Sequence, residues 1–598
     1  MRWVVCIILL LLFVAFHLGS YRLFLESQLL FYMATFMVGS ISLFYRKKTI
    51  YVNIGSLFLF LILLLMFVHF AIKGNEYGTT WIYTVLCSLV LFFALKNIFY
   101  QNPLFLKSVL LFIVIGLGIE LIIGIGQMNL LLKNENSNFL MGGTMGNPGA
   151  YANYLSVIVP FLLSVIWKLR YNKKVENIYY ILLGCIIISI FLIAMSQSRA
   201  AWIACTLACL LIVNKYSGLW NKVKYHIDSP VKKVATFLCL SISSIIIFYI
   251  LYNYKSESAF GRLLIWKITI LASHSHWLVG NGSGYFEANY GHWQEAYFST
   301  GGDTKLEYYV ADYVTCAYNE FIQIFVEQGF LGLMLLITLI LAAFKRKNLS
   351  HSILVTGSKA SLVSICILMC VSYPLQMRLI YFYFIVFLAI IFCEPQKNDC
   401  LLSKKVTNGL RCLYPILCLY ILWNACCNLY GLFLMRKGQT SVFTNDIKGG
   451  LECYQQAYPF LENNGIFLFY YSSALSLNKQ YVLAIRELEK AVKKTSNPSC
   501  YILLGDNYKE IQEYKKAESV YLKAVHALPS KLYPKYLLVK LYRESSQYEK
   551  AFNVADEIIQ MPEKVKTMLG KEIKEEMIHL VNNKCLIFKR DSLWKRKH

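Results

Sequence analysis

Charged residues are scarce in this 598-residue sequence: Asp, Glu, Lys and Arg make up 16% of it, against about 25% in a typical soluble domain. Apolar residues make up 57%, and the mean hydropathy is +0.49. A wholly soluble chain is therefore excluded. Strict alternation of apolar and polar residues is also missing, for example from residues 181–194, which argues against a transmembrane barrel. The sequence predicts an all-α membrane protein, because a helix satisfies its own backbone polar groups inside the bilayer.

Patterns for metal binding and for disulfides are missing as well. The 18 cysteines lie mostly inside apolar stretches, where Cys behaves as a small apolar residue, and neither a CxxC nor a Cys/His ligand spacing occurs. We therefore predict no metal site, no disulfide framework and no cofactor. The net charge of +25 does not indicate nucleic-acid binding, because many basic residues stand in short loops between apolar stretches, where membrane insertion places them.

Apolar stretches of about 18 or more residues recur along the first part of the chain, and each can cross a bilayer as a helix. No small-x-small cleavage site follows the first stretch, so we expect a retained helix there. The predicted spans, about 12–13 in all, lie near 2–19, 27–45, 50–72, 80–100, 106–127, 150–168, 177–195, 198–214, 235–253, 319–344, 353–373, 377–393 and 410–434.

The distribution of basic residues predicts an orientation. With an odd number of spans and a cytoplasmic N-terminus, all the basic clusters fall in the cytoplasm, as the positive-inside rule requires. The loops 128–149 and 254–318 then face outward, and so does the chain after the last span. The basic clusters are 46–48, 168–174, 215–233, 345–347 and 397–405.

Composition changes near residue 436, and the chain beyond it is rich in Lys and Glu. We predict a membrane domain at 1–435 and a soluble, α-helical, tetratricopeptide-like repeat domain at 436–598. Its surface would recognise a polypeptide or another subunit, or the repeats would only brace the membrane domain or a dimer. One helix–turn–helix unit of about 34 residues fits the repeat pattern closely, at Tyr501, Leu504, Gly505, Tyr508, Ala517, Tyr521, Ala524 and Pro529.

Three outward segments carry candidate chemistry. The loop 254–318 is long enough to be functional, and its aromatic faces and polar edges suit sugars, although membrane-interface belts also collect Tyr and Trp. The turn 196–199 presents an Arg that could hold a phosphate by two hydrogen bonds or reach toward lipid headgroups. The stretch 142–153 delivers backbone N–H groups at a helix start, which favours anions, or is an ordinary turn before a span.

Together these pieces resemble the O-antigen ligase/polymerase family over about residues 140–345. Each motif is weak alone, but their order and their placement on the outer face make the combination fairly specific. The motifs are Met145–Pro148, Ser196–Arg199, Arg262–Trp266, Gly280–Phe286 and Tyr318–Glu320, followed by Gln323, Glu327, Gly329 and Gly332.

The resemblance implies a multi-spanning glycosyltransferase of the C type in the bacterial inner membrane, with the repeat domain in the periplasm. Its donor would be a glycan on undecaprenyl pyrophosphate, transferred without a cofactor to an acceptor hydroxyl on the periplasmic face. By the same resemblance, the donor pyrophosphate would be held by Arg199, Arg262, Ser198 and Asn147.

The catalytic candidates are Tyr318, Asn319, Glu320, His292 and Asp312. Tyr318 stands where the family has a His, and an unperturbed tyrosine pKa of about 10 makes it a poor base. Either a neighbouring candidate accepts the proton, or base catalysis is dispensable because the leaving group departs ahead of attack.

The acceptor stays open among a protein, the lipid A core and a growing polymer, and the repeat domain favours a polypeptide acceptor or partner. A non-catalytic scaffold or a transporter with a docking domain is the alternative from another class. Transporters usually carry charges at mid-membrane, whereas few charges, such as Glu120, occur within the predicted spans. Membrane lipids complete the expected partners.

Overall fold

The computed structural model describes residues 26–44, 51–73, 80–101, 103–134, 139–170, 176–226, 229, 256–273, 276–301, 304–347, 352–396, 399–401, 403–564 and 567–583. The spans predicted at 2–19 and 235–253 lie outside the described residues, as does Asp303 of the outer loop.

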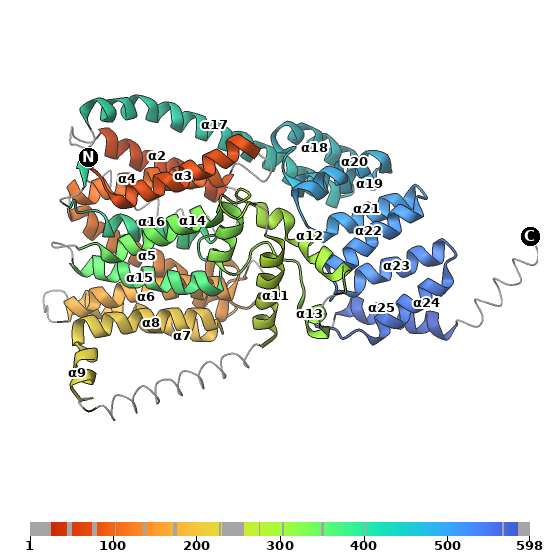
Figure 1. Cartoon of the computed structure of the whole chain (residues 1–598), viewed down its shortest axis with the longest axis horizontal. Coiled ribbons are helices and arrows are strands. Elements are labelled where there is room, and N and C mark those ends of the chain that lie inside the picture. Colours follow the sequence, from red (N-terminus) through yellow and green to blue (C-terminus); the bar gives the residue numbers. More distant parts are fainter. Residues whose placement is uncertain are drawn as a thin grey trace, which may run out of the picture.

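Long apolar helices form one bundle, which Figure 1 shows beside a second group of helices. Nine helices of the described part are long and apolar enough to cross a membrane, and α2 and α16 are shorter apolar helices. Every predicted span within the described residues coincides with a helix, which confirms an all-α, multi-spanning membrane protein. The bundle consists of α2 (Glu26–Phe44), α3 (Ile54–Lys73), α4 (Thr80–Gln101), α5 (Pro103–Met128), α6 (Pro148–Leu169), α7 (Glu176–Met195), α8 (Arg199–Ser217), α14 (Glu320–Lys345), α15 (Ser352–Val371), α16 (Arg378–Ile391) and α17 (Lys404–Phe443).

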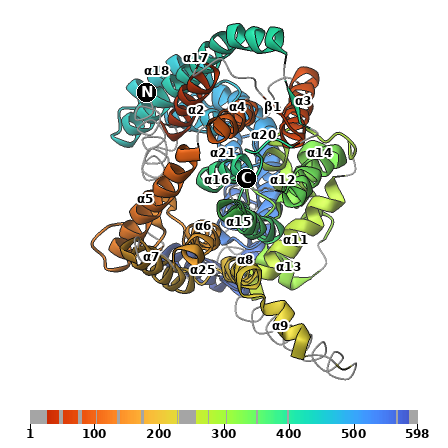
Figure 2. The same cartoon turned by 90° about the vertical axis from the view of Figure 1, so that its left-hand side faces the viewer.

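Helices α6 and α16 are the most enclosed members of the bundle. The α6 span is 89% buried, whereas the α7 span is 28% buried, so α6 lies among other helices and α7 leaves most of its surface for lipid. Figure 2 shows α16 near the centre of the bundle, with α15 beside it and α8 at the edge. Helix α6 begins sharply because Asn147 caps it and Pro148 occupies its first position.

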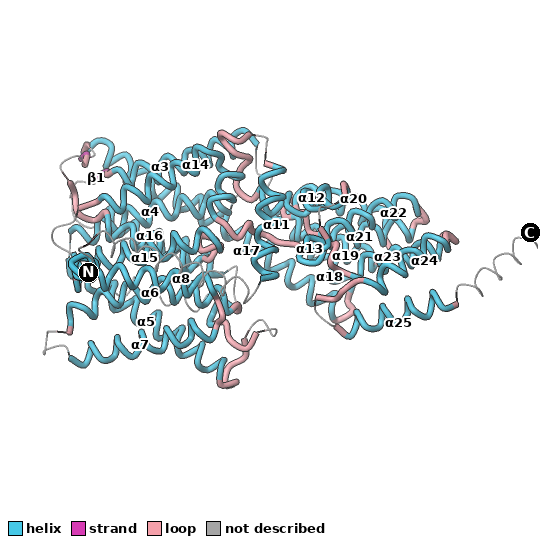
Figure 3. Tube along the Cα trace, turned by 60° about the horizontal axis from the view of Figure 1, so that its bottom comes forward, coloured by secondary structure: helices cyan, strands magenta, loops and turns pink. Residues whose placement is uncertain are grey.

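The described residues between 256 and 319, here called the outer segment, build a small group of helices at one end of the bundle (Figure 1). It contains α11 (Ser256–Ala272), α12 (Tyr285–Ser299) and α13 (Lys305–Val310), and buried apolar side chains of all three form one cluster. The other end carries α9 (Leu219–His226) and an antiparallel pair, β1 (Tyr51–Val52) and β2 (Cys400–Leu401). A 3-10 turn, η1 (Gly143–Met145), precedes α6. Figure 3 shows irregular segments gathering between the bundle and the second group of helices.

Helix α14 is interrupted at Gly329, where φ is 69° and ψ is −173°. The loop 277–283 inserts beside this break, and the Phe330 backbone N–H donates to the Trp277 carbonyl at 2.9 Å. A Cβ at Gly280 would collide with the backbone nitrogen of Gly329. The glycine-rich motif therefore serves a close approach of two backbones. Because the loop satisfies backbone groups that the interrupted helix releases, the break is tolerated inside the protein.

The second group of helices consists of paired units. After α17 come α18 (Ile447–Leu461), α19 (Gly465–Leu477), α20 (Tyr481–Lys494), α21 (Pro498–Glu510), α22 (Tyr514–Ala527), α23 (Leu532–Glu544), α24 (Tyr548–Gln560) and α25 (Met568–Asn582). The turn inside each unit has one residue with left-handed backbone, at intervals of 33 or 34 residues: Asn445, Lys479, Gln512 and Ser546, with φ between 58° and 68°.

The first of these units shares a helix with the membrane bundle. Helix α17 runs without interruption through the predicted boundary at 435/436, and its last turns pair with α18. The position of the helical units relative to the membrane is therefore set by a continuous helix and not by a flexible linker. The division into two domains at 435/436 and the assignment to the tetratricopeptide family both stay predictions.

Candidate functional site

Arg262 connects the outer segment with the end of a membrane helix. Its side chain extends from α11, where Nη1 donates to the carbonyl oxygen of Val371 at 2.6 Å. Its Cζ lies 5.5 Å from the centroid of the Tyr318 ring. Burial lowers the pKa of the Arg262 guanidinium, Tyr318 raises it, and the positive charge on Arg199 lowers it further.

The charge on Arg199 therefore acts on Arg262, although the two residues belong to α8 and α11. Among the described residues, no carboxylate lowers or raises the pKa of Arg262, and its hydrogen bond to Val371 goes to a neutral carbonyl. Two guanidinium groups within electrostatic reach repel each other, and an anion between them removes that repulsion. The arrangement therefore favours a ligand with several negative oxygens.

Tyr318 has an unusual backbone conformation, with φ of +51°. A left-handed conformation costs energy for an aromatic residue, and it persists where surrounding contacts impose it. The preceding residue, Ala317, accepts a hydrogen bond from Trp266 Nε1 at 2.9 Å and donates one to Gln323 Oε1 at 3.1 Å. The Tyr318 ring packs edge-on against Tyr373, with 5.3 Å between the centroids. Burial raises the pKa of the Tyr318 hydroxyl, so the phenol stays protonated at neutral pH.

The turn between α7 and α8 places Ser198 and Arg199 at the start of α8. Gln197 is left-handed, with φ of 54°, and the Ser198 backbone N–H donates to Ser196 Oγ at 3.3 Å. Trp202 braces the turn, because its Nε1 donates to the Ile193 carbonyl at 2.9 Å. The tight turn expected from the sequence is present.

Asn147 and Asn319 both act as helix caps. Asn147 Oδ1 accepts from the backbone N–H groups of Gly149 and Ala150, at 2.8 and 3.3 Å. Asn319 Oδ1 accepts in the same way from two N–H groups at the start of α14. Side-chain oxygens that cap a helix satisfy N–H groups that an anion would otherwise use. This geometry supports the ordinary-turn interpretation of 142–153, and the donor role of Asn147 stays a prediction.

A buried carboxylate also fixes the turn before α6. Glu120 Oε2 accepts from the Thr144 backbone N–H at 3.1 Å, and Glu120 Oε1 accepts from the Thr144 hydroxyl at 2.5 Å. Gln127 Oε1 accepts from the N–H groups of Gly142 and Gly143. The charge at Glu120 therefore has a structural explanation within the bundle.

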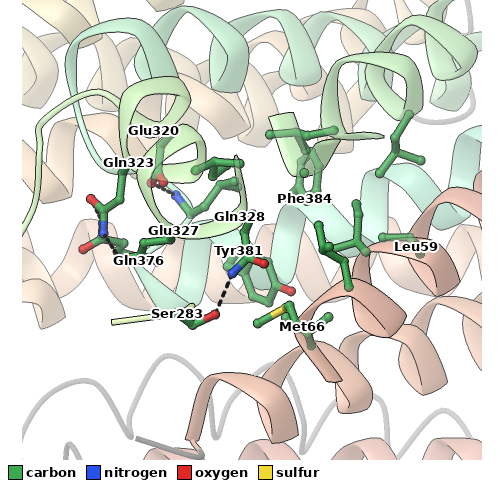
Figure 4. Close-up of a pocket in the computed structure, with 18 of the residues that line it drawn as sticks. Leu59, Met66, Ser283, Glu320, Gln323, Glu327, Gln328, Gln376, Tyr381 and Phe384 are labelled. Carbon is green, nitrogen blue, oxygen red and sulfur yellow. Dashed lines mark hydrogen bonds between the residues drawn. The ribbon is translucent and has the colours of Figure 1, made fainter. Parts of the chain in front are cut away.

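A cavity of about 140 Å³ lies between α3, α14 and α16. Glu320 lines it and accepts a hydrogen bond from the Leu375 backbone N–H at 2.8 Å. Gln328 Nε2 donates to Ser283 Oγ at 2.8 Å, whereas Gln328 Oε1 is buried and has no hydrogen-bond partner in the described part of the chain. Figure 4 shows the polar side chains gathered at one end and the apolar ones at the other: Ser283, Glu320, Gln323, Glu327, Gln328 and Gln376 against Leu59, Met66 and Phe384.

Comparison with known proteins identifies part of the chain. Residues 183–337 match the model of a family described as O-antigen ligase. This stretch is similar to an O-antigen ligase domain, and we refer to it as the ligase domain. It contains both arginines and the Tyr318–Glu320 motif, and it agrees with the resemblance predicted from the sequence.

Other comparisons add little. No curated protein matches the chain. Among solved structures, the MamA RS-1 ArsTM double mutant is 17% identical, and the similarity covers 28% of this chain and 96% of that chain. Its TM-score of 0.23 carries no argument about fold or function.

Two predicted catalytic residues of the ligase domain contact the helical units. His292 Nε2 donates to the Val492 carbonyl at 3.0 Å, and His292 Nδ1 lies 2.6 Å from the Tyr501 hydroxyl. Because a carbonyl only accepts, a neutral His292 accepts from Tyr501 through Nδ1. Asp312 Oδ2 pairs with Lys531 Nζ at 3.2 Å. The structure therefore places His292 at a contact with the helical units, while the Asp312 charge also acts on Tyr318.

Several polar residues that line this cavity were not predicted from the sequence as site residues. Gln323 and Glu327 were recognised only as motif positions, and Gln328 was not singled out. A signal was available, because Glu320, Gln323, Glu327 and Gln328 recur at helical spacing along one face of an otherwise apolar span. Gln376 and Ser283 come from distant segments, so only the fold brings them here.

Proposed function

We propose that this protein transfers a glycan from a lipid pyrophosphate to an acceptor hydroxyl at the periplasmic face of a bacterial inner membrane. The O-antigen ligase domain indicates an enzyme of glycan ligation in general. The observation that carries the finer proposal is the proximity of Arg199 and Arg262, two cations from different elements. A pyrophosphate presents several anionic oxygens, and arginine binds such groups with two parallel hydrogen bonds.

In this proposal the arginines act on the leaving group. The bond between the anomeric carbon and the pyrophosphate oxygen breaks, and the charge that develops on that oxygen is stabilised by Arg199 and Arg262. The acceptor oxygen forms the new bond to the anomeric carbon, and its proton is released to water. Tyr318 contributes the face of its ring, which attracts the Arg262 guanidinium. No base is needed when departure of the leaving group runs ahead of attack.

The cavity between α3, α14 and α16 supports a place for the acceptor. Its polar end includes Glu320, which lies two residues after Tyr318, and the unpartnered Oε1 of Gln328. A buried acceptor without a partner is costly, and a ligand hydroxyl would remove that cost by donating to it. The proposal assigns the pyrophosphate to the two arginines, because they are cations, and the acceptor hydroxyl to the cavity.

The test is deletion in the native host, followed by parallel analysis of glycoproteins, lipopolysaccharide and capsule. We expect one of these glycoconjugates to disappear, and the accumulating lipid-linked glycan to identify the donor. Complementation with the natural sequence should restore the product, whereas Arg262→Lys should not. A deletion strain in which all three classes and the lipid-linked pool are unchanged would contradict the proposed function.

A further inference from the structure

The segment between α13 and α14, residues 311–319, carries Tyr318 but has no helix or strand of its own. Regular backbone hydrogen bonding therefore does not fix its conformation. At its C-terminal end, Ala317 forms hydrogen bonds with Trp266 and Gln323, which both belong to the ligase domain. Its N-terminal end is held from a different direction, by residues more than 200 positions later in the sequence.

The helical units contact this N-terminal end through the turn that joins α22 to α23. Ser530 Oγ donates to the Ala311 carbonyl at 2.7 Å, and Lys531 Nζ lies 3.2 Å from Asp312 Oδ2. Ala311 is buried, whereas the Lys531 and Asp312 side chains are half-exposed. One sheltered hydrogen bond and one ion pair thus act on adjacent residues of the segment.

The turn between α20 and α21 also contacts the outer segment, at α12. Ser496 Oγ donates to the Glu287 carbonyl at 2.9 Å and accepts from the Gly291 N–H at 3.0 Å. Burial raises the pKa of Tyr313, whereas hydrogen bonds with Thr495 and Ser496 lower it. Two successive turns of the repeat therefore bind the outer segment, and Figure 1 shows α12 and α13 lying against the helical units.

The same units are joined to the membrane through α17, which extends without a break from Lys404 to Phe443. The helical units therefore hold the outer segment at a position that the bundle itself fixes. This arrangement accounts for the left-handed backbone of Tyr318, because such a conformation persists where its surroundings determine it from several sides.

We infer that Ser530 and Lys531 are positioning residues of the ligase site. They fix residues 311–319 so that Tyr318 keeps its backbone conformation and its ring stays against Arg262. The helical units thereby serve the active site from within the molecule, and the turns that do so are already occupied. The catalytic consequence rests on the proposed function, whereas the positioning of the segment does not.

A charge-swap cycle in the full-length protein in lipid nanodiscs tests this inference. Asp312→Lys and Lys531→Asp each replace an attraction by a repulsion, and the double variant restores it with the charges exchanged. Amide hydrogen exchange within 311–319 should rise in each single variant and return in the double variant. In transfer assays, kcat should fall about fivefold to tenfold in the single variants, with the donor KM unchanged, and recover in the double variant.

A matched control is the ion pair Arg543–Glu576, 3.4 Å long, which lies within the helical units between α23 and α25 and is half-exposed like the tested pair. Its charge swap and its single reversals should leave exchange in 311–319 and kcat unchanged. Ser530→Ala, a milder change, should raise exchange in the same segment without altering folding.

Two outcomes would overturn the inference. If kcat falls in the Asp312 variant and the swap does not restore it while exchange stays normal, Asp312 acts in the chemistry itself. If the control pair has the same effect, the contacts report only domain stability. Hydrogen exchange within 311–319 could rise in the single variants and return in the double variant although the protein has no transfer activity. This result would support positioning of the segment and contradict the proposed function, so the two failures are distinguishable.

Discussion

The guanidinium of Arg262 lies against the ring of Tyr318, with 5.5 Å between Cζ and the ring centroid. An aromatic face attracts a cation whether or not the ring carries a hydroxyl. Tyr318 therefore has a function that phenylalanine can also perform, and this function differs from the proton transfer expected of the histidine that Tyr318 replaces.

The first prediction concerns the hydroxyl of Tyr318. Tyr318→Phe should keep kcat/KM within about twofold, whereas Tyr318→Ala should lower it about tenfold, because the alanine removes the ring beside Arg262. Burial raises the pKa of Tyr318, so its titration lies above the usual tyrosine range and no limb of the pH–rate profile below about pH 10 should belong to it. Loss of all activity in Tyr318→Phe, with membrane insertion and donor binding intact, would show that the hydroxyl is essential.

The second prediction concerns the two arginines. Arg199→Lys and Arg262→Lys should each lower transfer about 100-fold, because lysine keeps the charge but loses the two parallel hydrogen bonds. The double variant should lose much less than the product of the single losses, since the residues act as a unit. Arg170→Lys, at the C-terminal end of α6, is the matched control and should leave transfer unchanged. Independent, multiplicative effects measured with purified proteins would argue against a shared phosphate site.

The third prediction concerns pH and His292. Burial lowers the pKa of His292, Glu295 raises it and Lys523 lowers it. Because the pKa in the folded contact is below the usual value of about 6.5, separation of α12 from the helical units takes up a proton. The contact is therefore fully stable above about pH 6.5 and weakens as pH falls toward the lowered pKa. The protection factors of amides in α12, which correct the exchange rate for its intrinsic dependence on pH, should therefore fall at pH 5.

The control for this prediction is His292→Gln, which removes the titration and should make the protection factors of α12 independent of pH between 5 and 8. His579→Gln, on α25, should leave their pH dependence unchanged. If the protection factors of α12 are equal at both pH values in the natural sequence, His292 does not control the contact.

The fourth prediction concerns Gln328. Its Oε1 is buried without a partner, and its Nε2 donates to Ser283. Gln328→Met removes one unsatisfied group and one hydrogen bond, so stability should change by less than about 1 kcal/mol. Transfer should nevertheless fall about tenfold if an acceptor hydroxyl donates to this oxygen. Thr338→Val, lower on the same helix, is the control. Unchanged KM and kcat in Gln328→Met would place the acceptor elsewhere.

The predictable parts of this molecule are those encoded by local sequence. Apolar runs long enough to span a bilayer predicted the helices, and the spacing of Tyr501, Gly505 and Tyr521 predicted one helical pair. Tertiary contacts were not predictable. Nothing local indicates that α17 continues into the helical units, that His292 bonds to Tyr501, or that Gln328 lies beside Ser283. The proposed Arg199–Arg262 site was predicted only because both residues match motifs of one family, since no local sequence signal relates the start of α8 to α11.

The last prediction concerns the side of the membrane. Because α12 contacts α22, the outer segment and the helical units lie on one side. The membrane helices between them in sequence are α14, α15, α16 and α17, an even number of crossings, which agrees with that contact. The segments outside the described residues do not enter this count. The positive-inside rule then predicts that this common side is the periplasm, because Lys168, Lys215 and Lys345, described residues of the basic clusters, lie in the last turns of their helices at the other end. Alkaline phosphatase fused after residue 583 should be active, and a fluorescent protein that folds only in the cytoplasm should be dark there. The same reporters inserted after Lys222 should behave in the opposite way. A cytoplasmic signal at residue 583 would contradict the charge assignment, and opposite sides for residues 301 and 583 would contradict the packing of α12 on the helical units.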